Sequence, residues 1–166
     1  MTFLIFDFDG TIADSLNVNI KVINKLAIKY GFNEIPKKDI RRKEMKELFR
    51  EANIPLIKLP LIIEEAMVEA SHEKLKPFKG IREVLFKLRD NYNLGIITAN
   101  SKSNADRFLK ENHLEIFDFV HSSTIFNKNR AIKKVLKNFN ILDACYIGDE
   151  TRDIEAAKKA KVRCVA

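Results

Sequence analysis

The sequence predicts an α/β fold: a Rossmann-like, three-layer core with a parallel sheet, interrupted by an inserted all-α module. Short apolar runs of strand-like composition recur along the chain, and from Gly80 onward they alternate with helical stripes. Such alternation forms right-handed βαβ crossovers and a parallel sheet covered on both faces. The residues between the first run and Pro77 carry helical stripes alone, which indicates an insertion.

Five short apolar runs are predicted to be buried parallel strands. The first, residues 2–6, reads Thr-Phe-Leu-Ile-Phe and is followed by an acidic segment that contains a glycine. A run this short, rich in β-branched and aromatic residues, suits a buried strand better than a helix. The same pattern recurs at residues 94–97, 119–121, 144–147 and 162–165.

Three stripes of apolar residues at helical spacing lie between the later strands. Ser101 or Ser103 is expected to cap the second of these helices, because a serine hydroxyl can accept a hydrogen bond from the first turn. The stripes consist of Ile81, Val84, Leu85, Leu88 and Tyr92, then Ala105, Phe108 and Leu109, and finally Ile132, Val135, Leu136 and Phe139.

Residues 14–77 are predicted to form the inserted helical module. They carry three further stripes and no convincing strand, and Pro77 and Gly80 mark the return to the sheet. The predicted domains are therefore an α/β core at residues 1–13 and 78–166 and a helical module between them. The stripes consist of Ile20, Ile23, Ala27 and Tyr30, then Met45, Leu48, Phe49 and Ala52, and finally Ile62, Ile63, Ala66, Met67 and Ala70.

The composition is typical of a globular domain. Of the 166 residues, 46% are hydrophobic and 32% are charged, which argues against a disordered or fibrous chain. The formal net charge of +7 favours anionic partners. The lysines are scattered over amphipathic helices, so a solvated surface is the better interpretation. No recognised nucleic-acid-binding motif is present, and we expect no specific nucleic-acid partner.

The sequence predicts neither export nor membrane insertion. No apolar run approaches the length of a membrane span, and the N-terminus leads directly into a strand rather than a signal peptide. Cys145 and Cys164 fall in apolar runs without metal-ligand spacing, so we expect buried free thiols in a reducing compartment. A cytoplasmic protein without a membrane partner is expected.

Polar residues at four strand ends are the candidates for chemistry. In open α/β sheets, ligands bind at the carboxyl ends of the strands. Acidic, hydroxyl, amide and ammonium groups from these ends are expected to converge on one crevice. The groups are Asp7 and Asp9 after the first strand, Thr98, Ala99 and Asn100 at the second, Lys128 after the third, and Asp149 and Asp153 after the fourth.

The acidic residues among these candidates predict a metal site. Asp7 and Asp9 are two positions apart, which places them on the same side of an extended chain. Like charges held close together are unfavourable unless a cation or a shared proton offsets them. Asp149 and Asp153 are one helical turn apart, so both can face the crevice. Oxygen ligands with room for water suit Mg²⁺.

Each candidate also has an ordinary structural interpretation. An aspartate after a strand is often a turn or capping residue, and Asp149 could cap the helix that follows. Thr98 could simply favour a strand, and Lys128 is one of many lysines, which are usually exposed. The functional interpretation therefore depends on the combination of groups and not on one residue.

Segment 7–11, Asp-Phe-Asp-Gly-Thr, resembles the nucleophile motif of the haloacid dehalogenase superfamily of phosphohydrolases. Thr98 is similar to that family's second motif, Lys128 to its third and segment 148–153 to its fourth, in the family's order and over essentially the whole chain. The inserted helices resemble the small α-helical cap of the phosphoglycolate-phosphatase-like branch. The resemblance implies a Rossmann-like core with an all-α cap at residues 14–77.

The resemblance implies a magnesium-dependent phosphatase. Asp7 would attack phosphorus and form an aspartyl-phosphate. Asp9 would protonate the leaving oxygen and then deprotonate the hydrolytic water. Mg²⁺ would be bound by Asp7, the Asp9 carbonyl and Asp149, with Asp153 behind these ligands.

The resemblance also implies a small phosphorylated metabolite as substrate, with phosphoglycolate as a candidate. Asn100 and the cap residues Arg41 and Arg42 are weaker candidates for substrate contact, and for either arginine alone a solvated helix face is the better interpretation. The cap would close over the site and exclude water. The phosphoryl oxygens would be held by Phe8, Gly10, Thr98, Ala99 and Lys128.

Alternative functions remain open. A phosphotransferase or phosphomutase of the same superfamily would share every motif and shield its aspartyl-phosphate from water. A phospho-accepting signalling receiver also uses Asp, Thr, Lys and Mg²⁺, but its phosphoacceptor lies on a middle strand and it has no helical cap. A nucleic-acid-binding module is suggested only by the net charge.

The last predicted strand runs to the end of the sequence at Ala166. The family domain usually continues with more strand and a final helix. We therefore expect either a truncated domain or a sheet that ends early, with an exposed edge that needs cover.

Overall fold

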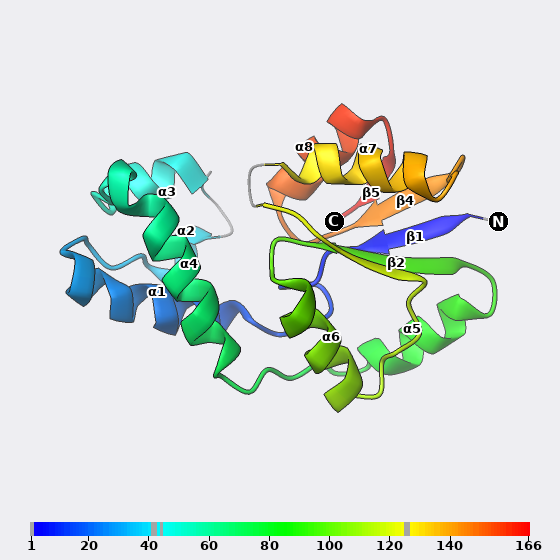
Figure 1. The fold of residues 1–166 in the computed structure, drawn as a ribbon, viewed down its shortest axis with the longest axis horizontal. Helices are drawn as coiled ribbons and strands as arrows, with labels where there is room; N and C mark the ends of the chain where they lie inside the picture. Colours follow the sequence, from blue (N-terminus) through cyan, green and yellow to red (C-terminus); the bar gives the residue numbers. More distant parts are fainter. Residues whose placement is uncertain (1, 41–42, 44, 125–126) are drawn as a thin grey trace. The chain divides into compact units, whose positions relative to one another are not determined.

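Five parallel strands form one sheet in the computed structural model, which describes residues 2–40, 43, 45–124 and 127–166. The strand order is β3-β2-β1-β4-β5, so the first strand of the chain lies in the middle (Figure 1). The predicted Rossmann-like α/β fold is confirmed. The strands are β1 (Phe3–Phe6), β2 (Asn93–Thr98), β3 (Phe119–Ser122), β4 (Ala144–Ile147) and β5 (Arg163–Val165).

The register of the central strands determines which residues meet at the carboxyl edge of the sheet. Phe6, the last residue of β1, pairs with Ile96 of β2 and with Ile147 of β4. The Asp7 N–H then donates to the Ile147 carbonyl at 2.7 Å, which continues the pairing one residue past the strand. Asp7 therefore leaves the sheet between the ends of two neighbouring strands.

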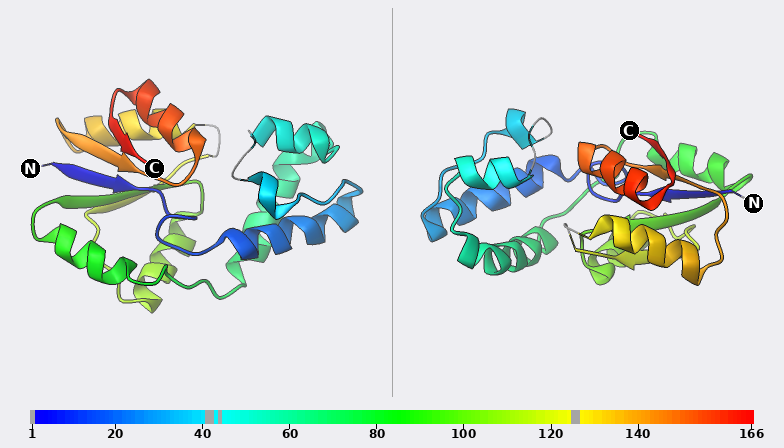
Figure 2. Two further views of the ribbon diagram at one scale, coloured as in Figure 1. Left: turned by 180° about the vertical axis from the view of Figure 1, so that it is seen from behind. Right: turned by 90° about the horizontal axis from the view of Figure 1, so that it is seen from above.

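Helices cover both faces of this sheet. Helices α5 and α6 lie together on one face, and α7 and α8 lie on the other (Figures 1 and 2). The Ser101 hydroxyl accepts a hydrogen bond from the Asn104 N–H, which confirms one of the two predicted caps of α6. The bounds are α5 (Ile81–Arg89), α6 (Lys102–Glu111), α7 (Lys128–Asn138) and α8 (Thr151–Ala160).

The predicted helical stripes match the buried faces only in part. Leu85 is fully buried, but Val84 is 50% exposed, because the short helix α5 turns a narrow face to the sheet. Phe139 is 49% exposed and lies just past α7, where its ring packs against the Phe119 ring with centroids 4.7 Å apart. The core on the α7–α8 side is continuous from Ile5 through Ile97, Ile132, Val135 and Tyr146 to Ala157.

The chain divides into two compact units, Met1–Asp14 with Lys76–Ala166, and Ser15–Leu75. The second unit consists of helices around their own apolar core. Its helix α1 buries Val22 and Leu26 together with Ala27, so the buried face is rotated from the predicted stripe. The helices are α1 (Leu16–Tyr30), α2 (Lys37–Ile40), α3 (Met45–Glu51), the 3₁₀ helix η1 (Leu56–Lys58) and α4 (Leu59–Ser71).

A ladder of ion pairs joins α1 to α4 and to Glu73, two residues past the end of α4, within the helical unit. Lys21, Lys25 and Lys29, one turn apart on α1, pair at 2.5–2.7 Å with acids on the other side. Their partners run in the opposite direction, which shows that the two segments are antiparallel. The pairs are Lys21–Glu73, Lys25–Glu69 and Lys29–Glu65.

Two smaller expectations concern the cysteines and membranes. Cys145 and Cys164 are free thiols, but they are half-buried rather than buried, and Cys164 lies on the edge strand β5. Burial still raises the pKa of both thiols. Within the described ranges, none of the helices has both the length and the apolar character that a membrane crossing requires.

Candidate active site

The Asp7 carboxylate is the centre of the site. Its side chain is almost fully buried at the end of β1. Its Oδ1 accepts a hydrogen bond from the Phe8 N–H at 2.8 Å, and its Oδ2 accepts one from Lys128 Nζ at 2.8 Å. Burial raises the pKa of Asp7 to about 7, Lys128 acts to lower it, and the negative charge of Asp153 raises it further.

Local packing fixes the loop that carries Asp7 and Asp9. The Phe8 side chain is fully buried and meets the Phe108 ring edge-on, with centroids 5.0 Å apart. The Phe8 carbonyl accepts from the Ile12 and Ala13 N–H groups, both at 2.9 Å, which closes a tight turn. Asp9 and Asp7 are therefore presented by a short, well-bonded loop at the edge of the sheet.

Lys128 is a buried lysine between two carboxylates. Its Nζ lies 2.8 Å from Asp7 Oδ2 and 2.5 Å from Asp153 Oδ1. Burial alone would lower its pKa, but the two carboxylates together hold the pKa above its ordinary value. The interpretation of Lys128 as one more exposed lysine is therefore wrong, since its side chain is only 11% exposed.

Asp153 connects this lysine to the start of α8. The fully buried Asp153 accepts the Glu150 N–H at 3.1 Å through Oδ2, as part of a capping box. Glu150 is thus the N-cap, and the alternative that Asp149 caps this helix is wrong. Instead, Asp149 Oδ1 lies 3.4 Å from the Thr11 hydroxyl of the β1 loop, so the motifs at the ends of β1 and β4 are in contact.

Two glycines allow the backbone to approach these acids closely. A Cβ at Gly10 would lie 2.4 Å from Asp149 Oδ2, and Gly10 also has a positive φ of 81°. A Cβ at Gly148 would lie 2.3 Å from Asp153 Oδ2. Both distances are too short for any side chain other than hydrogen, so the positions of both carboxylates depend on glycine.

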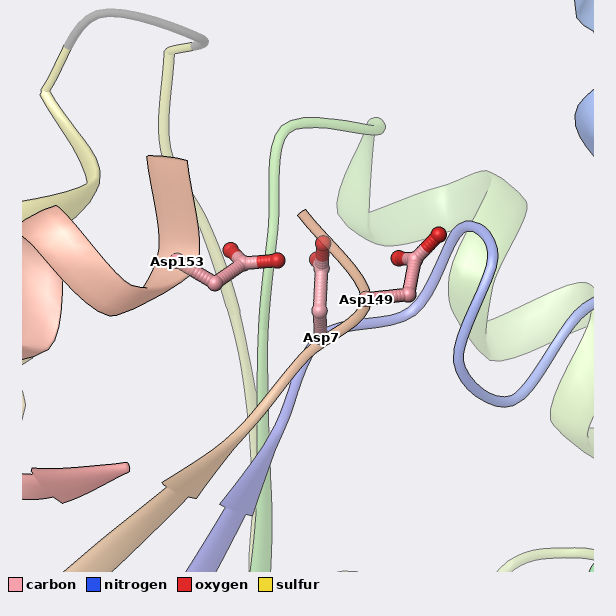
Figure 3. A group of neighbouring side chains, drawn as sticks. All are labelled: Asp7, Asp149 and Asp153. Atoms are coloured by element: carbon pink, nitrogen blue, oxygen red, sulfur yellow. The ribbon is translucent and has the colours of Figure 1, made fainter. Parts of the chain in front are cut away.

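Asp7, Asp149 and Asp153 form an acidic cluster. Each offers a carboxylate oxygen, and these oxygens all lie within 4.8 Å of one another. Figure 3 shows Asp7 between Asp149, from the loop after β4, and Asp153, from α8. Three carboxylates and the Lys128 ammonium sum to a formal charge of −3 + 1 = −2. Hard oxygen donors with an excess of two negative charges fit a divalent cation such as Mg²⁺.

The end of β2 supplies the remaining groups that the structure describes. Thr98 is fully buried, and its Oγ1 accepts the Asn100 N–H at 2.9 Å. Ala99 and Asn100 are half-buried. The Asn100 side chain donates from Nδ2 to Asp9 Oδ2 at 3.4 Å, so it reaches the β1 loop. The Phe8 N–H, a predicted phosphate ligand, donates to Asp7 in this structure.

Two predicted site residues are not among the described residues, and two residues near the site are not predicted from the sequence. Arg41 and Arg42, predicted to contact substrate, lie outside the described residues. The Tyr146 ring, 5.9 Å from Lys128 Nζ, was not expected near the site, because a tyrosine in an apolar run reads as core. Asn104, whose Nδ2 donates to Asn100 Oδ1 at 3.1 Å, is likewise not indicated by the motifs. Its spacing of four residues from Asn100 was the one available signal.

The fold and these groups define a class: a Rossmann-like α/β protein with an acidic, lysine-containing site at the carboxyl edge of its sheet. A family model for haloacid dehalogenase-like hydrolases matches residues 4–166. The chain therefore belongs to the haloacid dehalogenase-like hydrolase family. The resemblance seen in the sequence and the prediction of an enzyme are both confirmed at this level.

Similar proteins agree with this assignment. A phosphoglycolate phosphatase of Synechococcus elongatus is 30% identical over 176 residues, which cover 100% of this chain and 83% of the relative. A haloacid dehalogenase-like hydrolase of Streptococcus pneumoniae superposes with a TM-score of 0.83 at 21% identity, covering 100% of this chain and 84% of that one. The protein tyrosine kinase A of Mycobacterium tuberculosis superposes with a TM-score of 0.80 at 20% identity, covering 98% and 82%. At these identities the two structures show the fold alone. One is described as a hydrolase and the other as a kinase, so this fold does not by itself define an activity.

Proposed function

We propose that this protein is a magnesium-dependent phosphomonoester hydrolase that acts through an aspartyl-phosphate on a small phosphorylated metabolite. The observation that carries the proposal is the buried Asp7 carboxylate, which is bonded to Lys128 and lies within 4.8 Å of two further acids. The similarity to a phosphoglycolate phosphatase supports phosphoglycolate as the first substrate to test.

In the first proposed step, an Asp7 oxygen attacks phosphorus. A bond forms between that oxygen and phosphorus as the bond to the leaving oxygen breaks, and Asp9 donates a proton to the leaving oxygen. Lys128 offsets part of the negative charge that gathers around phosphorus. Two unit charges about 4 Å apart interact by roughly 4 kcal/mol at an effective dielectric constant of about 20.

In the second proposed step, Asp9 acts as the base. It takes a proton from a water molecule, whose oxygen attacks the aspartyl-phosphate. The bond between phosphorus and the Asp7 oxygen breaks, inorganic phosphate leaves and the Asp7 carboxylate is regenerated. Asp9 is thereby returned to its protonated form, ready for the next leaving group.

The proposed magnesium ligands are Asp7, Asp149 and the backbone carbonyl of Asp9. Asp153 supports them through its bonds to Lys128 and to the Glu150 amide. When bound, Mg²⁺ supplies positive charge that stabilises the phosphoryl oxygens in the transition state. Thr98, Lys128 and the amides of the two neighbouring loops remain the proposed phosphoryl contacts.

The helical unit Ser15–Leu75 is the proposed cap, which would recognise the leaving group. Lys46 and Lys58 are exposed and could serve this purpose. Lys43 is a weaker candidate, because it already pairs with Glu51 at 2.6 Å and with Asp39 at 3.5 Å. Arg41 and Arg42 remain candidates on sequence grounds.

A direct test measures release of inorganic phosphate from para-nitrophenyl phosphate and from a panel of phosphorylated metabolites. We expect turnover with Mg²⁺, none after chelation, and a loss of at least about 10³-fold in Asp7→Asn, which removes the nucleophile. Asp106→Asn, at an exposed ion pair with Lys102, is the matched control and keeps full activity. Wild-type turnover by Asp7→Asn would refute the mechanism.

The phosphotransferase alternative uses the same residues and needs a separate measurement. With a sugar phosphate as donor and a second sugar as acceptor, a hydrolase releases free phosphate, whereas a transferase moves the phosphoryl group to the acceptor hydroxyl. Predominant transfer would replace the hydrolase proposal.

A further inference from the structure

We propose that Tyr146 is a positioning residue, whose ring holds the Lys128 ammonium against Asp7 and keeps water away from it. The inference rests on the proposed function, because it assumes that Lys128 offsets negative charge around phosphorus. It extends the site from the loops at the sheet edge to a side chain inside the core.

The Tyr146 side chain is held at both ends. Its backbone lies on β4 and pairs with Ile5 of β1. Its hydroxyl donates to the Ile97 carbonyl of β2 at 3.3 Å, so the side chain reaches across β1 to the next strand. The whole residue is buried and belongs to the core cluster that also contains Ile132 of α7. The ring therefore has a fixed place between the sheet and α7.

Lys128, the first residue of α7, lies against this ring. Its Nζ is 5.9 Å from the ring centroid, just inside the range of about 6 Å in which a cation is attracted to an aromatic face. An ammonium group has three N–H donors, and Asp7 and Asp153 accept from it at 2.8 and 2.5 Å. The ammonium is thus in contact with two carboxylates and with an aromatic face.

The ring also limits the access of water to these charges. The side chains of Lys128 and Asp7 are 11% and 8% exposed, and Tyr146 is fully buried. A smaller side chain at position 146 would leave a space beside charged groups, and a space with polar walls takes up water. Water raises the effective dielectric constant and weakens the attraction between charges. The effect of Lys128 on Asp7 should therefore depend on the ring.

Removal of the ring tests this role. For Tyr146→Leu we expect kcat/KM with para-nitrophenyl phosphate to fall by about 10- to 30-fold, because Lys128 is hydrated and less firmly placed. Tyr146→Phe keeps the ring and should restore kcat/KM to within about threefold of wild type. Tyr146→Met fills more of the space than leucine does without a ring, so it should give a smaller loss, and it serves if the leucine variant does not fold.

A matched core variant separates positioning from loss of stability. Leu85 is fully buried on α5, which covers the opposite face of the sheet (Figure 1). Leu85→Ala should lower the Tm, as Tyr146→Leu does, but leave kcat/KM within about twofold of wild type when both are assayed well below their Tm. If Leu85→Ala loses as much activity as Tyr146→Leu, the loss reflects stability and the positioning role is wrong.

A double-variant cycle asks whether Tyr146 acts through Lys128. Lys128→Met keeps most of the side-chain length without the charge. In that background Tyr146→Leu should lower kcat/KM by less than about twofold, since no ammonium remains to be held. An equal loss in the presence and absence of the Lys128 ammonium would show that the ring supports the site in some other way, and would overturn the proposal.

Two outcomes overturn different statements. If Lys128→Met turns over like wild type, the role given to Lys128 in the proposed function is wrong. If Lys128→Met is impaired but the folded Tyr146→Leu and Tyr146→Met variants keep wild-type kcat/KM, only the positioning role is wrong.

A crystal structure of the metal-free Tyr146→Leu protein gives a readout without activity. We expect an ordered water molecule within hydrogen-bond distance of Lys128 Nζ, or an Nζ that has withdrawn from Asp7 Oδ2, which lies 2.8 Å away in the wild-type protein. A dry ammonium at an unchanged distance from Asp7 would also overturn the role.

Discussion

At the scale of single residues, the position of the Asp153 carboxylate depends on the absence of a side chain at Gly148, five residues earlier. The fully buried Asp153 holds Lys128 at 2.5 Å, and a Cβ at Gly148 would stand 2.3 Å from its Oδ2. The carboxylate would have to move, and Lys128 would move with it. A methyl group added at Gly148 should therefore disturb the Asp7 carboxylate indirectly, because Asp153 and then Lys128 would have to move.

Gly148→Ala should lower kcat with para-nitrophenyl phosphate by about 10- to 100-fold, because Lys128 is drawn away from Asp7. The added methyl should also cost about 1–3 kcal/mol of unfolding free energy in urea titrations. Gly80→Ala is the control. Its φ of +83° strains any side chain, by about 1–2 kcal/mol, but nothing lies within 4 Å of its Cβ, so kcat should not change. Equal kcat values for Gly148→Ala and wild type would contradict the coupling.

At the scale of elements, β2 and β3 fit together through one glycine and one ring. Gly95 pairs with Phe119 across the two strands, and a Cβ at Gly95 would lie 2.1 Å from the Phe119 ring. The ring also stacks on Phe3 with centroids 6.0 Å apart, which limits where it can move. The close packing of the edge strand β3 against β2 therefore depends on Gly95 and Phe119.

Gly95→Ala should destabilise the fold by about 1–3 kcal/mol, measured by urea unfolding, because the core has no room for the methyl group. Phe119→Leu in the same chain should recover part of that loss, since the smaller side chain makes room. A double variant that is destabilised by the sum of the two single changes would show that the two residues do not interact.

Asp118, which lies directly before β3, bonds to α5 and to β2, and these bonds predict an acid-sensitive contribution to stability. Arg89 donates two hydrogen bonds to Asp118, at 2.6 and 2.8 Å, and the Leu94 N–H donates a third at 3.0 Å. The hydrogen bonds from Arg89 are the main reason that the pKa of Asp118 lies below its ordinary value. Burial opposes this shift, and the hydrogen bond from the Leu94 amide supports it. The folded state therefore favours the ionised carboxylate.

Asp118→Asn should lower the Tm by about 2 °C between roughly pH 5 and pH 7, where the carboxylate is ionised in both folded and unfolded chains. Because the folded pKa is the lower one, this stabilisation is lost as the pH falls through it, and the Tm values of the two proteins should converge once the pH lies below the folded pKa of Asp118. Thermal unfolding followed by circular dichroism measures both. A Tm difference that persists undiminished at low pH would rule out the carboxylate as its source.

At the scale of the whole molecule, a bound cation should stabilise the fold. A ligand that binds only the native state at about 100 times its Kd adds about 2.7 kcal/mol. For a chain of this size, saturating Mg²⁺ should therefore raise the Tm by about 5–10 °C. Asp149→Asn should reduce that shift, whereas Glu155→Gln, at an exposed pair with Lys159, should not. A full shift in Asp149→Asn would exclude it as a ligand.

Much of the core could be predicted from the sequence, because its strands are short apolar runs with few alternatives. β4 has the predicted bounds, and β1 starts one residue later than expected. The rule for strand ends also indicated where Asp7, Lys128 and Asp153 would lie. The buried face of α1 could not be predicted, because Val22 and Leu26 compete with Ile20 and Ile23 until a packing partner is known. The contact from Asn100 to Asp9 depends on how an amide is turned, which residue spacing does not encode.

The lysines and glutamates of the ion-pair ladder both repeat every four residues along the chain. Sliding one helix by a single turn would bring Lys21 opposite Glu69 and Lys25 opposite Glu65, so two of the three attractions in the ladder would survive. The charges alone therefore hold the two helices side by side but do not determine their register. The distinction comes from contacts that do not repeat: the Tyr30 hydroxyl donates to Glu65, and Ile62 is fully buried. Replacing these two side chains would free the helices to slip while their charges stayed largely satisfied.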